Sequence, residues 1–217
     1  MTDSPSSPAS TDGAPTRLST HRLVRGFGRL RVLRGVDLEV EGGELLLITG
    51  RNGSGKSTLL RCLAGLMAPQ RGTIECRVDG RDLEVGERRL AVGYVAPDVE
   101  FYSELTTYEN LAFVCRLRRL DPERGRHLLE RVGLPEDRLA GALSSGMRQR
   151  LRWCWAHLAR PRILLLDEPL QNLDAPGRKT LLEMLGEHLA AGGLAVVANP
   201  ESMELTHHVA RCLDLGG

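Results

Sequence analysis

The nonapeptide GRNGSGKST, which begins at Gly50, has the residue types of a phosphate site. Gly50, Gly53 and Gly55 let the backbone turn so that successive N–H groups converge on an anion at the start of a helix. Lys56 adds a fixed cation for β- and γ-phosphate oxygens, and the Ser57 hydroxyl is a ligand type for Mg²⁺. The residues assigned to phosphate binding are Gly50, Arg51, Asn52, Gly53, Ser54, Gly55, Lys56, Ser57 and Thr58.

A glycine turn without a ligand is the alternative for this stretch, and the flanking residues argue against it. Leu45 to Thr49 is an apolar run of the length of a fully buried strand. From Ser57 to Leu66 the apolar residues recur at helical spacing. The order strand, glycine loop, helix is the order that a phosphate site requires.

A second motif, ILLLDE, places two carboxylates directly after another apolar run that starts at Ile163. Asp167 would leave a buried strand beside the phosphate loop, where it can hold Mg²⁺ through water. Glu168, one residue later, is placed to orient and deprotonate an attacking water. The alternative is that Asp-Glu-Pro only caps the next helix. We favour the catalytic interpretation because the phosphate loop is present.

The elements around these motifs predict an α/β fold with a mainly parallel sheet. A third apolar strand runs from Leu194 to Ala198, and helical patterns separate the three strands. A half-buried strand is expected from Arg31 to Val40, and residues 72–97 read as strand-like and irregular. Residues from about 98 to 160 read mainly as helices, so we expect a helical lobe inserted between two core strands.

One domain is expected, because the chain has 217 residues and no internal repeat. Residues 1–17, rich in Ser, Pro, Thr and Ala, predict a disordered tail, and residues 18–217 form the domain.

Lys and Arg number 29 against 28 Asp and Glu, and aromatics are 4%, so no nucleic-acid partner is expected. The five scattered cysteines predict buried thiols in a reducing cytosol. No run reaches the ~20 apolar residues of a membrane span.

Further motifs resemble those of the ABC ATPase family. The stretch LSSGM, from Leu143 to Met147, is similar to the family's signature sequence LSGGQ and lies ahead of the acidic motif ILLLDE. Asn172-Leu-Asp174 resembles the D-loop, and Phe27 resembles the aromatic residue that stacks on adenine. The stretches ELT and ENL, which start at Glu104 and Glu109, resemble the opening of the helical lobe. The resemblance covers residues 18 to about 212.

The resemblance implies a P-loop NTPase core with an N-terminal antiparallel β part and an inserted helical lobe. It also implies ATP and Mg²⁺ as cofactors, and a head-to-tail dimer of two ATPase subunits, identical or not. Each ATP would lie between the phosphate loop of one subunit and the signature of the other, with Ser144, Ser145, Gly146 and Asp174 among its contacts. A separate transmembrane permease subunit would hold the dimer at the cytoplasmic face of the membrane.

Two departures from the family pattern concern residues close to the chemistry. Where the family places a glutamine that senses Mg²⁺ and the membrane subunit, this chain has Pro97, and Asp98 is the nearest polar substitute. Where the family places a histidine after the strand that ends at Ala198, the chain has Asn199 and Pro200. Asn199 can donate an amide hydrogen bond to the γ-phosphate but cannot titrate. We include it among the catalytic candidates.

The favoured function is an ATPase that powers a separate membrane subunit for export. Small export-type ATPases, such as the haem-exporter ATPase of cytochrome c maturation, are similar in length and in the stretch LLLDEPLQNLD. One alternative is a regulatory ATP-binding module with impaired hydrolysis, which the two departures favour and Glu168 opposes. The other is a soluble ABC protein of DNA repair or translation, which the lack of a coiled-coil insertion or second ATPase domain disfavours.

Overall fold

A five-stranded parallel sheet forms the centre of the protein in the computed structural model, which describes residues 16–198, 205 and 209–216. Its strand order is β6-β7-β8-β3-β9, and each of the four pairings is parallel. The strands are β3 (Leu45–Thr49), β6 (Val92–Val95), β7 (Ile163–Asp167), β8 (Leu194–Ala198) and β9 (Val209–Asp214). The parallel sheet predicted from the apolar runs is confirmed.

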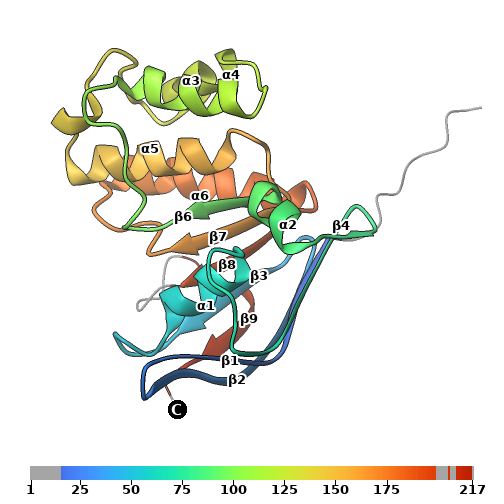
Figure 1. Ribbon diagram of the computed structural model, residues 1–217. Helices are drawn as coiled ribbons and strands as arrows, with labels where there is room; N and C mark the ends of the chain where they lie inside the picture. Colours follow the sequence, from blue (N-terminus) through green and yellow to red (C-terminus); the bar gives the residue numbers. More distant parts are fainter. Residues whose placement is uncertain (1–15, 199–204, 206–208, 217) are drawn as a thin grey trace, which may run out of the picture.

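The helices lie on both faces of this sheet (Figure 1). They are α1 (Lys56–Leu63), α2 (Val85–Ala91), α3 (Thr107–Leu117), α4 (Glu123–Arg131), α5 (Ser145–His157) and α6 (Ala175–Ala190), with a 3₁₀ turn at Ala140–Ala142. Because successive side chains of a strand point to opposite faces of the sheet, each central strand contributes residues to two hydrophobic cores. Leu164 and Leu166 pack with α5 and α6, whereas Ile163 and Leu165 pack with α1.

A four-stranded antiparallel sheet, ordered β2-β1-β4-β5, covers the α1 side. Its strands are β1 (Arg17–Phe27), β2 (Leu30–Glu41), β4 (Arg71–Val78) and β5 (Arg81–Asp82). Leu18, Leu23 and Leu33 are fully or almost fully buried against Leu59 and Leu60 of α1. The helix that follows the phosphate loop is thereby held between two sheets.

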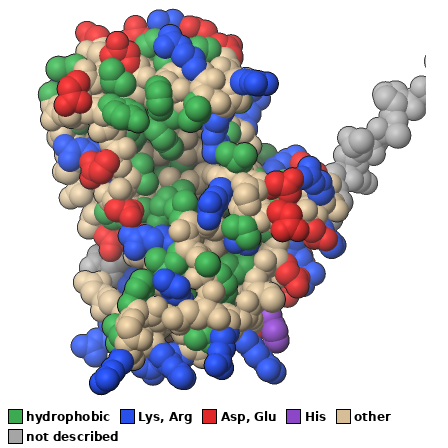
Figure 2. Space-filling model, viewed as in Figure 1, with side chains coloured by type: hydrophobic (Ala, Val, Ile, Leu, Met, Phe, Trp, Pro, Cys, Tyr) green, Lys and Arg blue, Asp and Glu red, His purple; other side chains and the backbone are tan. Residues whose placement is uncertain are grey.

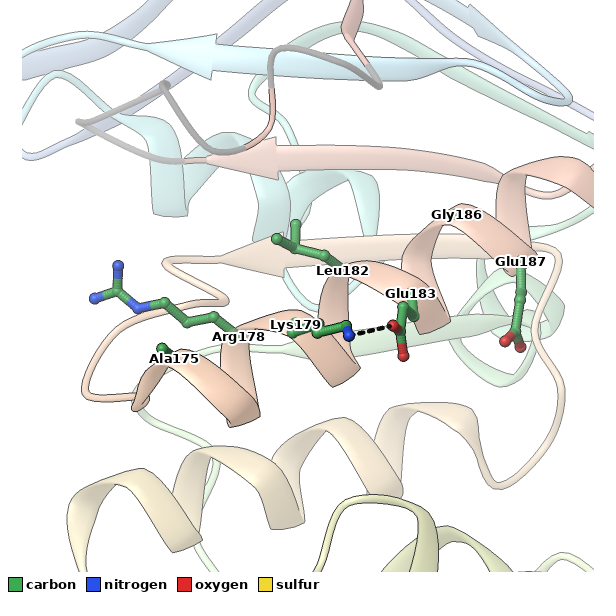
Figure 3. A pocket seen from close by; sticks show the side chains of 7 residues that line it. All are labelled: Ala175, Arg178, Lys179, Leu182, Glu183, Gly186 and Glu187. Atoms are coloured by element: carbon green, nitrogen blue, oxygen red, sulfur yellow. Dashed lines mark ion pairs between the residues drawn. The ribbon is translucent and has the colours of Figure 1, made fainter.

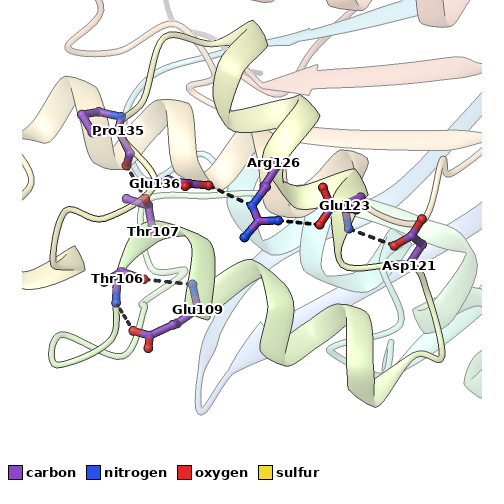
Figure 4. A network of polar contacts seen from close by, with 8 residues as sticks. All are labelled: Thr106, Thr107, Glu109, Asp121, Glu123, Arg126, Pro135 and Glu136. Carbon is purple, nitrogen blue, oxygen red and sulfur yellow. Dashed lines mark hydrogen bonds and ion pairs between the residues drawn. The ribbon is translucent and has the colours of Figure 1, made fainter.

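Helices α3, α4 and α5 fall within the stretch assigned to the inserted lobe, and α3 and α4 lie farthest from the sheets (Figure 1). Helix α3 opens with a capping box: Thr106 Oγ1 accepts from the Glu109 N–H at 3.1 Å, and the Glu109 carboxylate accepts from the Thr106 N–H at 2.8 Å. Arg126 of α4 binds Glu123 at 2.6 Å and Glu136 at 3.0 Å (Figure 4). The ELT and ENL stretches are therefore the start of α3.

Several details differ from the sequence expectations. The N-terminal antiparallel β part implied by the resemblance is present, but the residue pattern did not predict its strand β1. This strand begins at Arg17, a residue assigned to the tail, whose residues 1–15 lie outside the described part. The seven-residue helix α2 interrupts the stretch expected to be strand-like and irregular. Strand β9 was also not expected. Among the cysteines, Cys212 on β9 is exposed, so the prediction of five buried thiols was wrong for that residue.

Candidate functional site

The phosphate loop depends on glycine where the sequence places it. Gly50, Gly53 and Gly55 have φ of 137°, 81° and 109°, in the left-handed region that other residues rarely adopt. A Cβ on Gly55 would lie 2.7 Å from Val32 Cγ1 of β2, so the loop also passes too close to the antiparallel sheet for a side chain. The loop follows β3 directly and ends at the N-terminus of α1.

Lys56 is buried inside the loop, with 7% of its surface exposed. Its ammonium donates to the carbonyl oxygens of Gly50 at 2.6 Å and Arg51 at 3.1 Å. An ammonium has three donors, so one remains for an anion seated in the loop. Ser54 Oγ is buried and has no hydrogen-bond partner in the described part of the chain. The loop therefore fits a phosphate group.

A hollow of about 490 Å³ adjoins the phosphate loop. Its walls include Arg51 and Ser54 of the loop and Arg31 and Arg34 of β2. Phe27, at the end of β1, pairs with Leu30 on the edge of this hollow and is 46% exposed. The Arg25 guanidinium lies 5.2 Å from the centre of its ring. Adenine stacking on Phe27 stays a prediction.

The two residues predicted to hold Mg²⁺, Ser57 and Asp167, are brought together. Asp167 is 5% exposed at the end of β7. Burial raises the pKa of its carboxyl group, while a hydrogen bond with Ser57 and the charges of Arg61 and Lys56 oppose that rise. A hydroxyl and a buried carboxylate are oxygen donors of the kind that Mg²⁺ takes in a nucleotide site. The residues present therefore fit the metal.

Glu168 lies on a turn with left-handed backbone, at φ 48°. Its N–H donates to the Ala198 carbonyl at the end of β8 at 2.9 Å. Two side chains of α5 hold the same turn: Gln149 Nε2 donates to the carbonyls of Glu168 at 3.2 Å and Pro169 at 2.9 Å, and Trp153 Nε1 donates to Pro169 at 3.0 Å. The backbone of the Glu168 turn is therefore held by both β8 and α5.

The signature residues start α5. Ser144 is its N-cap, and Ser144 Oγ accepts from the Met147 N–H at 3.3 Å. Gly146 lies against the D-loop, since a Cβ there would meet the Asn172 carbonyl oxygen at 2.5 Å. Asp174 caps α6 and binds Arg150 of α5 at 2.5 Å, which lowers the pKa of its carboxyl group.

The structure does not bring the signature to the phosphate loop of the same chain. In the described part of the chain, no hydrogen bond or ion pair joins residues 144–146 to residues 50–58. Asn199 and Pro200 lie outside the described residues, so the role of Asn199 stays a prediction. Sequence reasoning did not identify the contacts of Gln149 and Trp153 with the Glu168 turn; the local signal was their place in the helix that follows the signature.

The hollow along α6 is a different kind of surface. It is lined by residues of one exposed helix face, where Lys179 and Glu183 form a 3.9 Å ion pair (Figure 3). It has no buried polar group and no contact with the phosphate loop in the described residues. It therefore offers controls for experiments on the nucleotide site.

A phosphate loop after one parallel strand and an acidic turn after another define a P-loop ATPase with an inserted helical lobe. Within that class, the chain belongs to the ABC transporter family, whose profile matches residues 33–171. It is an ATP-binding subunit of an ABC transporter and an ATPase that uses ATP with Mg²⁺.

Curated relatives include export and import subunits. The cytochrome c biogenesis ATP-binding export protein CcmA of Xanthomonas axonopodis pv. citri is 38% identical over 187 residues, which are 85% of this chain and 86% of that protein. CcmA of Nitrosococcus oceani is 36% identical over 208 residues, 94% of each chain. The sulfate/thiosulfate import ATP-binding protein CysA of Bradyrhizobium diazoefficiens is 41% identical over 179 residues, 77% of this chain and 52% of that protein.

Solved structures share the fold. An ATP-binding subunit of an ABC transporter superposes with a TM-score of 0.82 at 28% identity, over 92% of this chain and 85% of that one. A dimeric ATP-binding cassette in a post-hydrolysis state, bound to ADP and Pi, gives a TM-score of 0.80 at 23% identity, over 92% and 94%. No helix in the described part of this chain has the length and apolar character to cross a membrane.

Proposed function

We propose that this chain hydrolyses ATP as one of two cassettes that drive a separate membrane-spanning export subunit. The observation that carries the proposal is buried Asp167 at the end of β7, one residue before a Glu168 whose turn is held by β8 and α5. Export is favoured over import because CcmA relatives match 85 to 94% of this chain. The retained Glu168 gives no support to a regulatory module without hydrolysis.

In this proposal each residue has a separate task. Lys56 and the backbone N–H groups of the loop bind and orient the phosphates, and Glu168 accepts a proton from the attacking water. Ser57 and Asp167 would hold Mg²⁺, which supplies positive charge to the phosphate oxygens. Asn199 would donate an amide hydrogen bond to the γ-phosphate.

A second cassette completes the site. Ser144, Ser145 and Gly146 form a helix N-terminus that has no contact with its own phosphate loop in the described residues, and such an N-terminus suits a phosphate. We propose that it acts on the nucleotide of the partner cassette, next to Asp174. The partner is a second copy of the chain or a related cassette.

The membrane subunit would dock on an apolar groove of the helical lobe. Hydrophobic side chains gather over the lobe in Figure 2, and a groove of about 840 Å³ opens between the lobe and the core. Its apolar walls are formed by Leu90, Phe101, Tyr102, Phe113, Leu117 and Trp155. Leu117 is 74% exposed and Phe113 is 44% exposed, which is unusual for such large apolar side chains. A short amphipathic helix of the membrane subunit fits this groove and would hold the chain at the cytoplasmic face.

Mixing two inactive variants tests hydrolysis and the head-to-tail dimer together. Lys56→Ala removes the phosphate-loop cation, and Ser144→Arg blocks the signature, so each variant alone should be inactive. In a mixed dimer one site combines the intact loop of one variant with the intact signature of the other. An equal mixture should recover about a quarter of the wild-type ATPase rate per chain. A mixture as inactive as the separate variants would contradict the shared site, and an inactive wild type would contradict hydrolysis.

A further inference from the structure

The connection between β6 and α3, residues 96–106, forms an ion pair with helix α1. Asp98 lies in this connection, one residue after Pro97. Its carboxylate accepts from Arg61 at 2.7 Å, and Arg61 belongs to the last turn of α1, the helix that begins in the phosphate loop. The side chains are 36% and 53% exposed, so such a pair by itself contributes little stability.

Arg152 of α5 binds the same connection on both sides of Asp98. Its guanidinium donates to the carbonyl oxygens of Pro97 at 2.7 Å and Val99 at 3.0 Å. Arg152 is partly buried, and this burial lowers the pKa of its guanidinium. Three consecutive residues of the connection are therefore tied to two different helices.

The arginine also joins the catalytic turn. Arg152 donates to Gln149 Oε1 at 3.2 Å, and the amide group of Gln149 binds the carbonyls of Glu168 and Pro169. A continuous chain of polar contacts therefore runs from α1 through the connection and α5 to the turn that carries Glu168. We call the side chains of Arg61, Asp98 and Arg152 the polar strap.

The strap also brings charge to the metal-binding carboxylate. Asp98 acts to raise the pKa of Asp167, and Arg61 acts to lower it, so both charges reach Asp167. Pairing with Arg61 offsets the repulsion that a free Asp98 would exert on Asp167. Pro97 has no side-chain donor or acceptor, whereas the carboxylate of the neighbouring Asp98 accepts from Arg61.

We propose that Arg61, Asp98 and Arg152 are positioning residues for hydrolysis, which seat the β6–α3 connection against α1 and α5 and thereby hold the Glu168 turn. The inference rests on the proposed function. None of the strap's members belongs to the phosphate loop, so we expect their loss to affect turnover more than nucleotide affinity.

A double-mutant cycle of Asp98→Asn, Arg61→Gln and the double variant tests the pair in the full chain. Each single variant should lower kcat about three- to tenfold, while KM and the Kd of a fluorescent ATP analogue change less than about twofold. The double variant should be no slower than the slower single variant, because both substitutions break the same contact. Arg61→Lys, which keeps the charge, should retain most of the activity. An unchanged kcat in Asp98→Asn, or losses that multiply in the double variant, would overturn the proposal.

The matched control is the Arg131–Glu187 pair. It also joins a lobe helix to a core helix, at 2.6 Å and with side chains 39% and 63% exposed, but among the described residues no hydrogen bond or ion pair links it to the strap. Arg131→Gln and Glu187→Gln should leave kcat and KM unchanged. A similar kcat loss in these variants would show that any ion pair between lobe and core has the effect, and would overturn the assignment to the strap.

Hydrogen exchange without nucleotide separates the strap from the proposed function. Amides of residues 98–105 should exchange at least about tenfold faster in Asp98→Asn and in Arg152→Gln than in the wild type, and at the wild-type rate in Arg131→Gln. Exchange at the wild-type rate in both strap variants would overturn the strap. This readout needs no ATPase activity, so an inactive wild type would count against the proposed function and leave the strap test valid.

Discussion

The nucleotide edge of the sheet and the groove of the helical lobe are built in opposite ways. At the nucleotide edge the polar groups are buried: Lys56 is 7% exposed and Asp167 5%, and left-handed glycines shape the backbone around them. In the groove the apolar groups are exposed, with Leu117 at 74%. Buried polar groups need hydrogen-bond partners within the chain or on its ligand. Exposed apolar groups are instead stabilised when another chain covers them and removes them from water. Substitutions at the nucleotide edge should therefore change nucleotide binding or turnover in the isolated chain. Substitutions in the groove should change the association with the proposed partner.

The largest effect is expected for Lys56→Ala, which removes the cation inside the phosphate loop. We expect the affinity for a fluorescent ATP analogue to fall at least about 100-fold, because a buried, charge-assisted contact is lost. The chain contains one other lysine, Lys179, on the exposed face of α6. Lys179→Ala should bind the analogue like the wild type. Equal losses in the two variants would show that charge in general matters, and not its burial in the loop.

Glu168→Gln should separate binding from hydrolysis. The amide keeps the size of the side chain but cannot accept the proton of the attacking water, so kcat should fall about 10²- to 10⁴-fold. Analogue binding should stay near the wild-type value, since the bonds that hold the turn involve the backbone of Glu168. Glu183→Gln on α6 is the control. Wild-type turnover in Glu168→Gln would remove this carboxylate from the chemistry.

His157, at the end of α5, should make the stability of the protein depend on pH. Burial lowers the pKa of His157 from 6.5 to about 4, and burial also lowers the pKa of His188. The unfolded chain therefore binds protons below pH 6.5 that the folded chain does not bind until about pH 4. The free energy of unfolding should fall through that window as the pH is lowered, by up to about 3 kcal/mol for His157.

The measurement is urea unfolding at pH 7 and pH 4.5. His157→Phe keeps a ring that can stack on Trp153 but has no titrating group, so its unfolding free energy should depend less steeply on pH. His127→Gln, at an exposed position of α4, should keep the wild-type dependence. An unchanged slope in His157→Phe would mean that other groups cause the acid sensitivity.

The smallest effect in the isolated chain is expected in the groove. Phe113→Ser and Leu117→Ser should change the basal ATPase rate less than about twofold, because surface substitutions away from buried features have small effects. Co-purification with the membrane subunit should be lost. Leu66→Ser, which removes an exposed leucine outside the groove, should leave that association intact. A loss of basal activity in the groove variants would contradict the assignment of ATP turnover to the nucleotide edge and of partner binding to the groove.

The sequence predicted those features that depend on neighbouring residues and missed those that depend on contacts between residues far apart in the chain. Strand β3, the phosphate loop and α1 are consecutive, so their residue types determined the prediction. Strand β1 was missed because bulges between Thr20 and Leu23, and again near Arg25, break its alternation. The Arg61–Asp98 pair joins residues 37 positions apart, and the bonds of Gln149 and Trp153 reach 16 to 20 positions along the chain. No local pattern encodes such contacts.

The two tryptophans of the chain occupy places that make them optical reporters. Trp153 is fully buried, and its indole donates to the Pro169 carbonyl beside the catalytic turn. Trp155 lies on the wall of the groove, with its ring edge-on to Phe101 at 5.7 Å. Indole fluorescence responds to polarity and hydrogen bonding around the ring. A chain with Trp155→Phe would therefore emit from the nucleotide edge, and one with Trp153→Phe from the groove. Ordinary emission spectra could then follow ATP and the membrane partner separately, without an added dye.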